Sequence, residues 1–226
     1  MIIGDLQRRI GTEPDNIWGP RSKTALLTHF SNRQANGLTR ADLVAMAERL
    51  GCSLLQLEAV RAVEASGTGF DRAGRPKILY ERHKFHRATR GRHSPSWFSQ
   101  SASGGYSTDE DRNGVLDSWD KLSAAIATGE IDAAFEACSW GAFQIMGEWW
   151  DELGYPSPYA LAWTCAQSEG DHLELFARYI EFHELRDELR AITSNPETCR
   201  AFAAAYNGPR YAKGRYHEKI AARMRA

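Results

Sequence analysis

The chain has 226 residues and a formal net charge of −1, with 42% hydrophobic and 25% charged residues, which is ordinary for a globular protein. A chain of this size can bury a core without metal or disulfide staples, and no window approaches the roughly 18 apolar residues of a membrane span. The start, MIIGDLQRRI, has no apolar region and therefore lacks the pattern of a secretory signal. We expect a protein made in the cytoplasm of its producer, with no stable membrane insertion.

Residues that commonly bind metals or form disulfides are dispersed along the chain. His83 and His86 are three residues apart with His93 nearby, but arginines and a lysine surround them and would repel a cation. We therefore expect no metal and no cofactor. The cysteines contain no CxxC pair, which favours free, buried thiols; they are Cys52, Cys138, Cys165 and Cys199.

The charge is unevenly distributed. Basic residues dominate the stretches 82–93 and 196–226, whereas the stretch 109–136 is strongly acidic. A basic stretch can steer a protein to any polyanion, so charge alone does not choose between nucleic acid and an anionic cell wall. Because no nucleic-acid-binding motif accompanies these stretches, we expect no nucleic acid partner.

In chain order, the first boundary is the polar stretch SNRQANGL (residues 31–38), whose composition and Gly37 indicate a linker. It separates a short helical segment, residues 1–36, from a larger domain, residues 38–226. Thr39 and Asp42 form a capping pattern that predicts the start of a helix, and Gly51 predicts its end.

The next helix carries the most unusual residue of the sequence. Ser53 begins a second capping box, and the helix LLQLEAVRAVEAS that follows is ended by Gly67. Leu57, Val60 and Glu64 fall at i, i+3 and i+7, so Glu64 lies about 20° from Leu57 around the helix axis. A carboxylate at the end of an apolar stripe requires a partner or a purpose.

The remaining chain predicts one hairpin and several helices. Residues 68–70 and 76–81 flank the glycine-containing turn DRAGR and predict a short β-hairpin beside the end of the Glu64 helix. Apolar spacing of 3.6 residues predicts helices over 117–127, 143–153, around Leu161 and over 172–192. We therefore expect an α+β, mainly α protein with a small β-hairpin, preceded by a short helical segment.

Glu64 and Glu81 are candidates for a catalytic pair. Glycoside hydrolysis needs one carboxylic acid to protonate the leaving oxygen, and usually a second carboxylate to activate water or stabilise the developing cation. Apolar burial and the negative end of the helix dipole both favour a protonated Glu64, and Glu81 would face it from the far end of the hairpin. The alternative is structural: Glu64 forms a buried ion pair with Arg61 or Arg82.

Two further motifs follow along the chain. SWGAFQIMG (residues 139–147) combines small residues, a glutamine and a methionine at an expected helix start, and AYNGP (residues 205–209) is an expected sharp turn with an aromatic and an amide. In the order EAS, then SWGAFQIM, then AYNG, the motifs resemble the lysozyme-like superfamily, which includes goose-type lysozymes and lytic transglycosylases.

The similarity to one branch is closer. VEASGTGF (63–70), GRPKILYERHKF (74–85), SWGAFQIMG and YNGPRYA (206–212) resemble the phage N-acetylmuramidase family, over roughly residues 43–226. The resemblance implies a lysozyme-like fold, cleavage between N-acetylmuramic acid and N-acetylglucosamine, and catalysis by Glu64 and Glu81. Five residues are expected to contact substrate: Ser139, Gln144, Tyr206 and Asn207 lining the sugar cleft, and His83 hydrogen-bonding beside Glu81.

The first segment has a resemblance of its own. LQRRIG (6–11) and NIWGPRSKTAL (16–26) are similar to the helical peptidoglycan-binding module, in a copy of about half the usual length that lacks the first helix. So short a segment buries too little core to fold alone, which predicts docking on the main domain. A vestigial extension without wall affinity is the alternative.

These expectations combine into a monomeric phage endolysin that cleaves peptidoglycan for host lysis. Without a signal peptide, it would remain in the host cytoplasm until a holin-type pore releases it to the periplasm. A lytic transglycosylase is the nearest rival, using Glu64 alone to form a 1,6-anhydro product without water. A catalytically inactive wall-binding protein is the rival from another class, and the presence of both glutamates argues against it.

Overall fold

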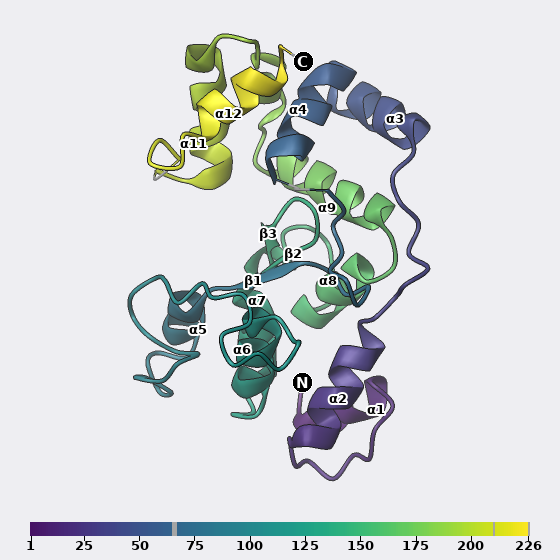
Figure 1. The fold of residues 1–226 in the computed structure, drawn as a ribbon, viewed down its shortest axis with the longest axis vertical. Helices are drawn as coiled ribbons and strands as arrows, with labels where there is room; N and C mark the ends of the chain where they lie inside the picture. The colour runs from purple at the N-terminus through teal and green to yellow at the C-terminus, as the bar shows by residue number, and fades with distance from the viewer. Residues whose placement is uncertain (65–66, 210, 226) are drawn as a thin grey trace.

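The computed structural model describes residues 1–64, 67–209 and 211–225 and is mainly helical, with one small antiparallel sheet at its centre (Figure 1). This confirms the expected fold class. The helices before the sheet's second strand are α1 (Ile3–Arg9), α2 (Pro20–His29), α3 (Arg40–Leu50), α4 (Leu54–Glu64), α5 (Arg82–Ala88), α6 (Asp117–Ile126) and α7 (Ile131–Glu136). Those after it are η1 (Gly147–Trp149), α8 (Pro158–Cys165), α9 (Glu169–Phe182), α10 (Arg186–Arg190), η2 (Pro196–Cys199), α11 (Arg200–Asn207) and α12 (Tyr216–Arg223).

The sheet has three short strands in the order β1 (Ile78–Tyr80), β2 (Cys138–Trp140) and β3 (Ile145–Met146). Side chains alternate between its faces. One face is buried, and there Ile78 pairs with Trp140, which pairs with Ile145. On the other face Leu79 lies opposite Ser139.

The helix expected over 143–153 is wrong. Residues 138–146 instead form the β2–β3 hairpin, and a 3₁₀ turn follows. The connection contains Gly141 and Gln144 with φ values of 72° and 51°, which a right-handed helix cannot accommodate. Ile145, one of the apolar residues of the expected helix, is buried because it pairs with Trp140 in the sheet and not because it lies on a helical face.

Two other expectations need correction. The hairpin at 68–81 is reduced to a tight turn with one bridge, Phe70 to Pro76, and the strand that continues from it pairs with β2. The helix expected over 172–192 divides into α9 and α10 at Glu184, whose φ is 54°. The expected last turn of α4 extends to Ser66, and residues 65 and 66 lie outside the described residues.

The first segment packs against the sheet region and shares its core. Figure 1 shows α1 and α2 at one end of the molecule and α3 and α4 at the other, with the linker between them. Phe30, at the end of α2, is fully buried, with ring centroids 5.3 Å from Trp119, 6.0 Å from Trp140 and 6.2 Å from Phe135. The segment is therefore joined to the rest of the chain by buried aromatic contacts.

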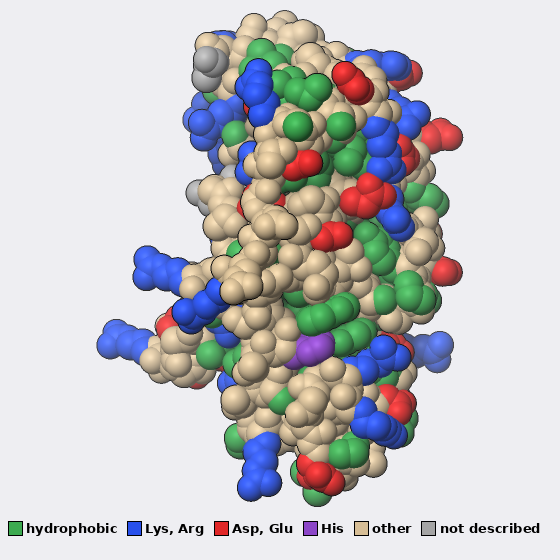
Figure 2. Space-filling model, turned by 90° about the vertical axis from the view of Figure 1, so that its right-hand side faces the viewer, with side chains coloured by type: hydrophobic (Ala, Val, Ile, Leu, Met, Phe, Trp, Pro, Cys, Tyr) green, Lys and Arg blue, Asp and Glu red, His purple; other side chains and the backbone are tan. Residues whose placement is uncertain are grey.

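Charged side chains lie among apolar ones on the face shown in Figure 2, with both signs interspersed. Many tie elements together: Arg49 of α3 lies 2.7 Å from Glu181 of α9. The basic stretch after β1 also forms an ion pair of this kind, since Arg92 lies 2.7 Å from Glu130. Among the residues described, no helix has the length and apolarity needed to cross a bilayer.

The expected free thiols are present. All four cysteines are free, and Cys138, Cys165 and Cys199 are buried, as predicted, whereas Cys52 is half-buried. Burial raises the pKa of the Cys138 thiol well above its usual range. A thiol kept in its neutral form is a poor nucleophile and a poor metal ligand, so Cys138 serves packing.

Candidate active site

Local sequence places Glu64 at the end of α4. Ser53 and Gln56 exchange reciprocal hydrogen bonds at the start of the helix, with Ser53 Oγ 3.2 Å from the Gln56 amide nitrogen. Leu57 and Val60 are fully buried, as the apolar stripe predicts. Because the stripe faces the core, Glu64 at the end of the helix lies where the core borders a cleft.

The carboxyl group of Glu64 lies in a protonating environment. Its Oε1 atom is buried and has no hydrogen-bond partner among the described residues. Burial raises the pKa of Glu64 to about 8, and a hydrogen bond with the Asn207 side chain acts in the opposite direction. Arg61 and Arg82, the expected ion-pair partners, contact Glu169 and the Ala102 carbonyl oxygen instead. Glu64 is thus suited to donate a proton near neutral pH.

Glu64 lines a cleft of about 1050 Å³ together with the open face of the sheet. Lys77 and Leu79 of the β1 row and Gln144 of the β2–β3 turn line the same cleft. Ser139 Oγ donates to Gln144 Oε1 at 2.8 Å, and Gln144 Nε2 donates to the Gly141 carbonyl at 2.8 Å. The structure therefore brings Glu64 and Gln144 together, and Ser139 orients Gln144 from the buried floor.

Glu81 lies directly after β1, at the N-cap of α5, and is not among the residues that line the cleft of Glu64. By strand alternation its position is on the same side as Leu79, two residues earlier, which does line the cleft. Its side chain is 16% exposed, and its Oε2 accepts a hydrogen bond from the Tyr106 hydroxyl at 2.6 Å. His83 Nδ1 lies 3.1 Å from the same oxygen, which makes an ion pair when the imidazole is protonated. His83 thus lies beside Glu81 as expected, but its Nδ1 makes no hydrogen bond among the described residues, so the predicted hydrogen bond stays a prediction.

Tyr206 and Asn207 reach the site from α11. Asn207 contacts the Glu64 carboxyl, as noted, and is exposed. The Tyr206 hydroxyl donates to the Phe143 carbonyl oxygen at 2.6 Å, and its ring stacks on Phe202 with centroids 5.4 Å apart. Burial, and then the nearby charge of Glu64, raise the pKa of Tyr206 well above its ordinary value. Tyr206 thus supports the wall behind Glu64 and anchors the β2–β3 turn.

Three supporting residues were missed by sequence reasoning. Glu169 is 5% exposed and its Oε1 accepts from the Gly69 amide at 2.7 Å, which holds the chain that leaves the Glu64 helix. Buried His172 accepts from the Ala142 amide at its Nδ1, 3.2 Å away, which fixes the β2–β3 turn. Both lie at the start of α9, where the only sequence signal is the Ser168 cap. Tyr106, which holds Glu81, lies in a loop without any motif.

Comparisons with known proteins identify the family of the chain. The profile of the N-acetylmuramidase family matches residues 53–226, a range that includes Glu64, Glu81 and Gln144. The crystal structure of Burkholderia AP3 phage endolysin is similar over 99% of this chain and 93% of that chain, with 31% sequence identity and a TM-score of 0.71. No similar sequence is found among curated proteins. The chain belongs to the N-acetylmuramidase family and is a glycoside hydrolase of peptidoglycan.

Proposed function

We propose that the chain is a phage endolysin that hydrolyses the bond between N-acetylmuramic acid and N-acetylglucosamine during host lysis. The observation that carries the proposal is Glu64, a carboxyl group with a pKa of about 8 that lines an open cleft. The similarity to the Burkholderia AP3 phage endolysin supports the lytic role. Release to the periplasm through a holin-type pore belongs to the same proposal.

In the proposed mechanism, the glycan strand lies along the cleft over the open face of the sheet. Glu64 donates its proton to the glycosidic oxygen as the bond to the anomeric carbon breaks. Glu81, held by Tyr106 and His83, assists the attacking water or stabilises the developing positive charge. Gln144 and Asn207 present amide groups that suit sugar hydroxyl and acetamido groups.

Mass spectrometry of muropeptides released from purified peptidoglycan tests this proposal. Hydrolysis at the proposed bond yields products with a reducing N-acetylmuramic acid end, which borohydride reduces with a gain of two hydrogens. A lytic transglycosylase would yield 1,6-anhydro ends, which are lighter by one water and resist reduction. Anhydro products from the wild-type chain would overturn the hydrolytic proposal, and no products at all would favour an inactive wall-binding protein.

We further propose that residues 1–36 form the peptidoglycan-binding unit and that residues 38–226 form the catalytic domain. A groove of about 520 Å³ lies between the turn after α1 (residues 10–12) and α2, and Arg21, Thr24 and Thr28 of α2 are exposed along it. A binding unit beside a catalytic cleft raises the local concentration of enzyme on an insoluble substrate.

Surface variants can separate wall binding from folding, whereas deletion of the segment would remove Phe30 from the core. We expect Arg21→Gln with Thr28→Val to weaken sedimentation with insoluble peptidoglycan while cleavage of soluble glycan fragments stays unchanged. Arg223→Gln, exposed on α12, is the matched control. Unchanged sedimentation of the double variant would show that this groove is not the wall contact.

A further inference from the structure

The loop from Asp109 to Asp120, DEDRNGVLDSWD, has the residue spacing of a calcium-binding loop. Such a loop takes oxygen ligands from positions 1, 3, 5, 7, 9 and 12, with glycine at position 6 for a sharp turn. Position 6 is Gly114, whose φ is 79°. The ligand positions are Asp109, Asp111, Asn113, the Val115 carbonyl, Asp117 and Asp120, the last in place of the usual glutamate.

The side chains at these positions converge in space. Oxygen atoms of Asp109, Asp111 and Asp117 all lie within 4.8 Å of one another. Asp120 is joined to them through Asn113, whose Nδ2 donates to Asp111 at 2.9 Å and to Asp120 at 2.8 Å. The sequence spacing and the folded positions are separate observations of one centre, in which the Asn113 amide would turn its oxygen inward to bind a cation.

The converging carboxylates have no basic group of the described chain in direct contact, although the charge of Lys121 interacts with Asp117 from further away. Asp109 Oδ1 is buried without a hydrogen-bond partner, and Asp117 is only 6% exposed. Asp120 forms an ion pair with Lys23, at 2.7 Å. Among the described residues, no basic nitrogen lies within 4.0 Å of the carboxylates of Asp109, Asp111 and Asp117. Asp117 is buried, Asp109 is half-buried and Asp111 is exposed, and carboxylates this close repel one another unless a cation neutralises them.

We propose that residues 109–120 bind one calcium ion through these six positions. A hard cation with oxygen ligands from a flexible loop fits calcium, whereas magnesium demands a tighter octahedral shell and retains more of its water. The α6 helix begins at position 9 of the loop, as the exit helix of such a site does, and residues 104–108 replace an entry helix.

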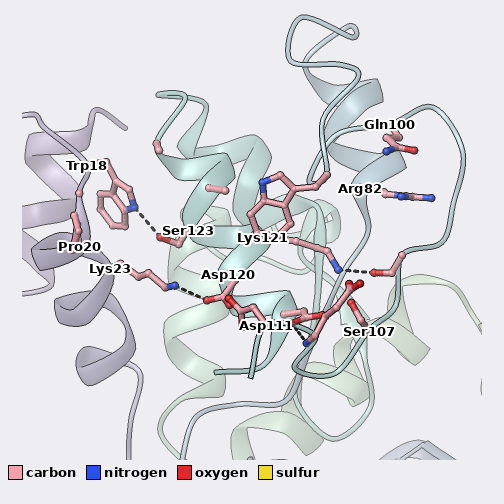
Figure 3. A pocket seen from close by; sticks show the side chains of 17 residues that line it. Trp18, Pro20, Lys23, Arg82, Gln100, Ser107, Asp111, Asp120, Lys121 and Ser123 are labelled. Atoms are coloured by element: carbon pink, nitrogen blue, oxygen red, sulfur yellow. Dashed lines mark hydrogen bonds and ion pairs between the residues drawn. The ribbon is translucent and has the colours of Figure 1, made fainter. Parts of the chain in front are cut away.

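The ion site lies in the wall between two cavities. Asp109 and Gly114 line the cleft that contains Glu64. Asp111 and Asp120 line a second cavity of about 810 Å³, which Trp18 and Lys23 of the first segment close from the other side (Figure 3). Calcium would therefore stiffen both the cleft wall and the contact with residues 1–36.

Terbium luminescence on the full, chelator-treated chain tests binding directly. Terbium replaces calcium at oxygen sites, and Trp119 within the loop is placed to sensitise its emission. We expect sensitised emission that calcium quenches at a concentration at least about tenfold lower than magnesium does, because the loop offers a calcium-type ligand set. Absence of sensitised emission, or emission that calcium does not quench, would overturn the proposal.

Substitutions locate the ion. Asp109→Asn with Asp111→Asn should abolish emission and the rise in Tm that calcium gives the wild type, while Asp187→Asn, exposed on α10, should retain both. Asp111→Asn alone changes an exposed side chain and serves if the double variant fails to fold. A folded loop variant that binds as tightly as the wild type would place the ion elsewhere and refute the assignment.

Removal of the ion pair between Lys23 and Asp120 is expected to strengthen calcium binding, whereas the loop substitutions are expected to weaken it. Lys23→Met removes the cation from Asp120 and should tighten calcium binding several-fold, since a ligand oxygen is released. Unchanged affinity would contradict the assignment of Asp120 as the ligand at position 12. These measurements depend on metal binding and melting, so they are independent of whether Glu64 is catalytic.

Discussion

Glu64 and Glu81 are the same residue type in opposite surroundings. Glu64 ends an apolar helix stripe, and its buried Oε1 atom has no hydrogen-bond partner among the described residues. Glu81 follows a strand, accepts a hydrogen bond from Tyr106 and lies beside His83. The difference teaches that the environment, not the residue type, would separate the proposed proton donor from its proposed charge-stabilising partner. Substitutions at and around the two glutamates test this contrast, and the expected effects decrease from Glu64 to Tyr106.

The largest effect is expected at the proton donor. Glu64→Gln retains the shape of the neutral acid but has no proton to donate, so we expect at least about a 100-fold loss of peptidoglycan turnover. The measurement is the release of reducing ends from purified cell walls, with circular dichroism to confirm the fold. Glu58→Gln on another face of α4 is the matched control. A folded Glu64→Gln enzyme with wild-type turnover would remove Glu64 from the mechanism.

Glu81→Gln should have the next largest effect. Its proposed contribution arises in the transition state, so kcat should fall by about tenfold or more while KM changes little. Steady-state kinetics on soluble glycan fragments measure both constants. A variant with unchanged kcat would make Glu81 structural, and the contrast between the two glutamates would then have no catalytic meaning.

The pKa of Glu64 also predicts a pH dependence of stability. Its pKa is about 8 in the folded chain against 4.5 in the unfolded one, so between these values the folded state holds a proton that the unfolded state releases. The free energy of unfolding therefore falls as pH rises, by up to about 1.4 kcal/mol per pH unit from this group. Glu64→Gln removes that loss, so the variant should gain stability relative to wild type from pH 5 to pH 8. Urea titrations across that range would contradict the assignment if both proteins followed parallel curves.

The smallest effect is expected from the group that holds Glu81. Tyr106→Phe removes one hydrogen bond to the carboxylate, worth about 1–3 kcal/mol at most, at a side chain that is 52% exposed. We expect a few-fold decrease in kcat with an unchanged Tm. Tyr155→Phe, away from the cleft, is the comparison variant. A loss as large as that of Glu81→Gln would show that Tyr106 acts on the substrate itself.

Much of this protein is determined by sequence over short distances. The capping residues Thr39 and Ser53 define where α3 and α4 begin, because a cap satisfies amide groups only three residues away. The apolar stripe of α4 places Glu64 at the edge of the core, since helical periodicity is local. The order of the motifs identifies the family. The spacing of an ion-binding loop is also present in the sequence at residues 109–120, although the expectation of no metal weighed only histidines and cysteines.

The tertiary structure decided the features that depend on distant neighbours. Residues 138–146 form strands instead of a helix because β2 pairs with β1, about 60 residues earlier. Glu169 and His172 fix the segments around the site from α9, and Phe30 merges the first segment with the core. The raised pKa of Glu64 also depends on distant parts of the chain. A sequence places the carboxylate on a helix face, but its pKa is set by how completely the folded chain excludes water from it, and that is a sum over groups from several elements.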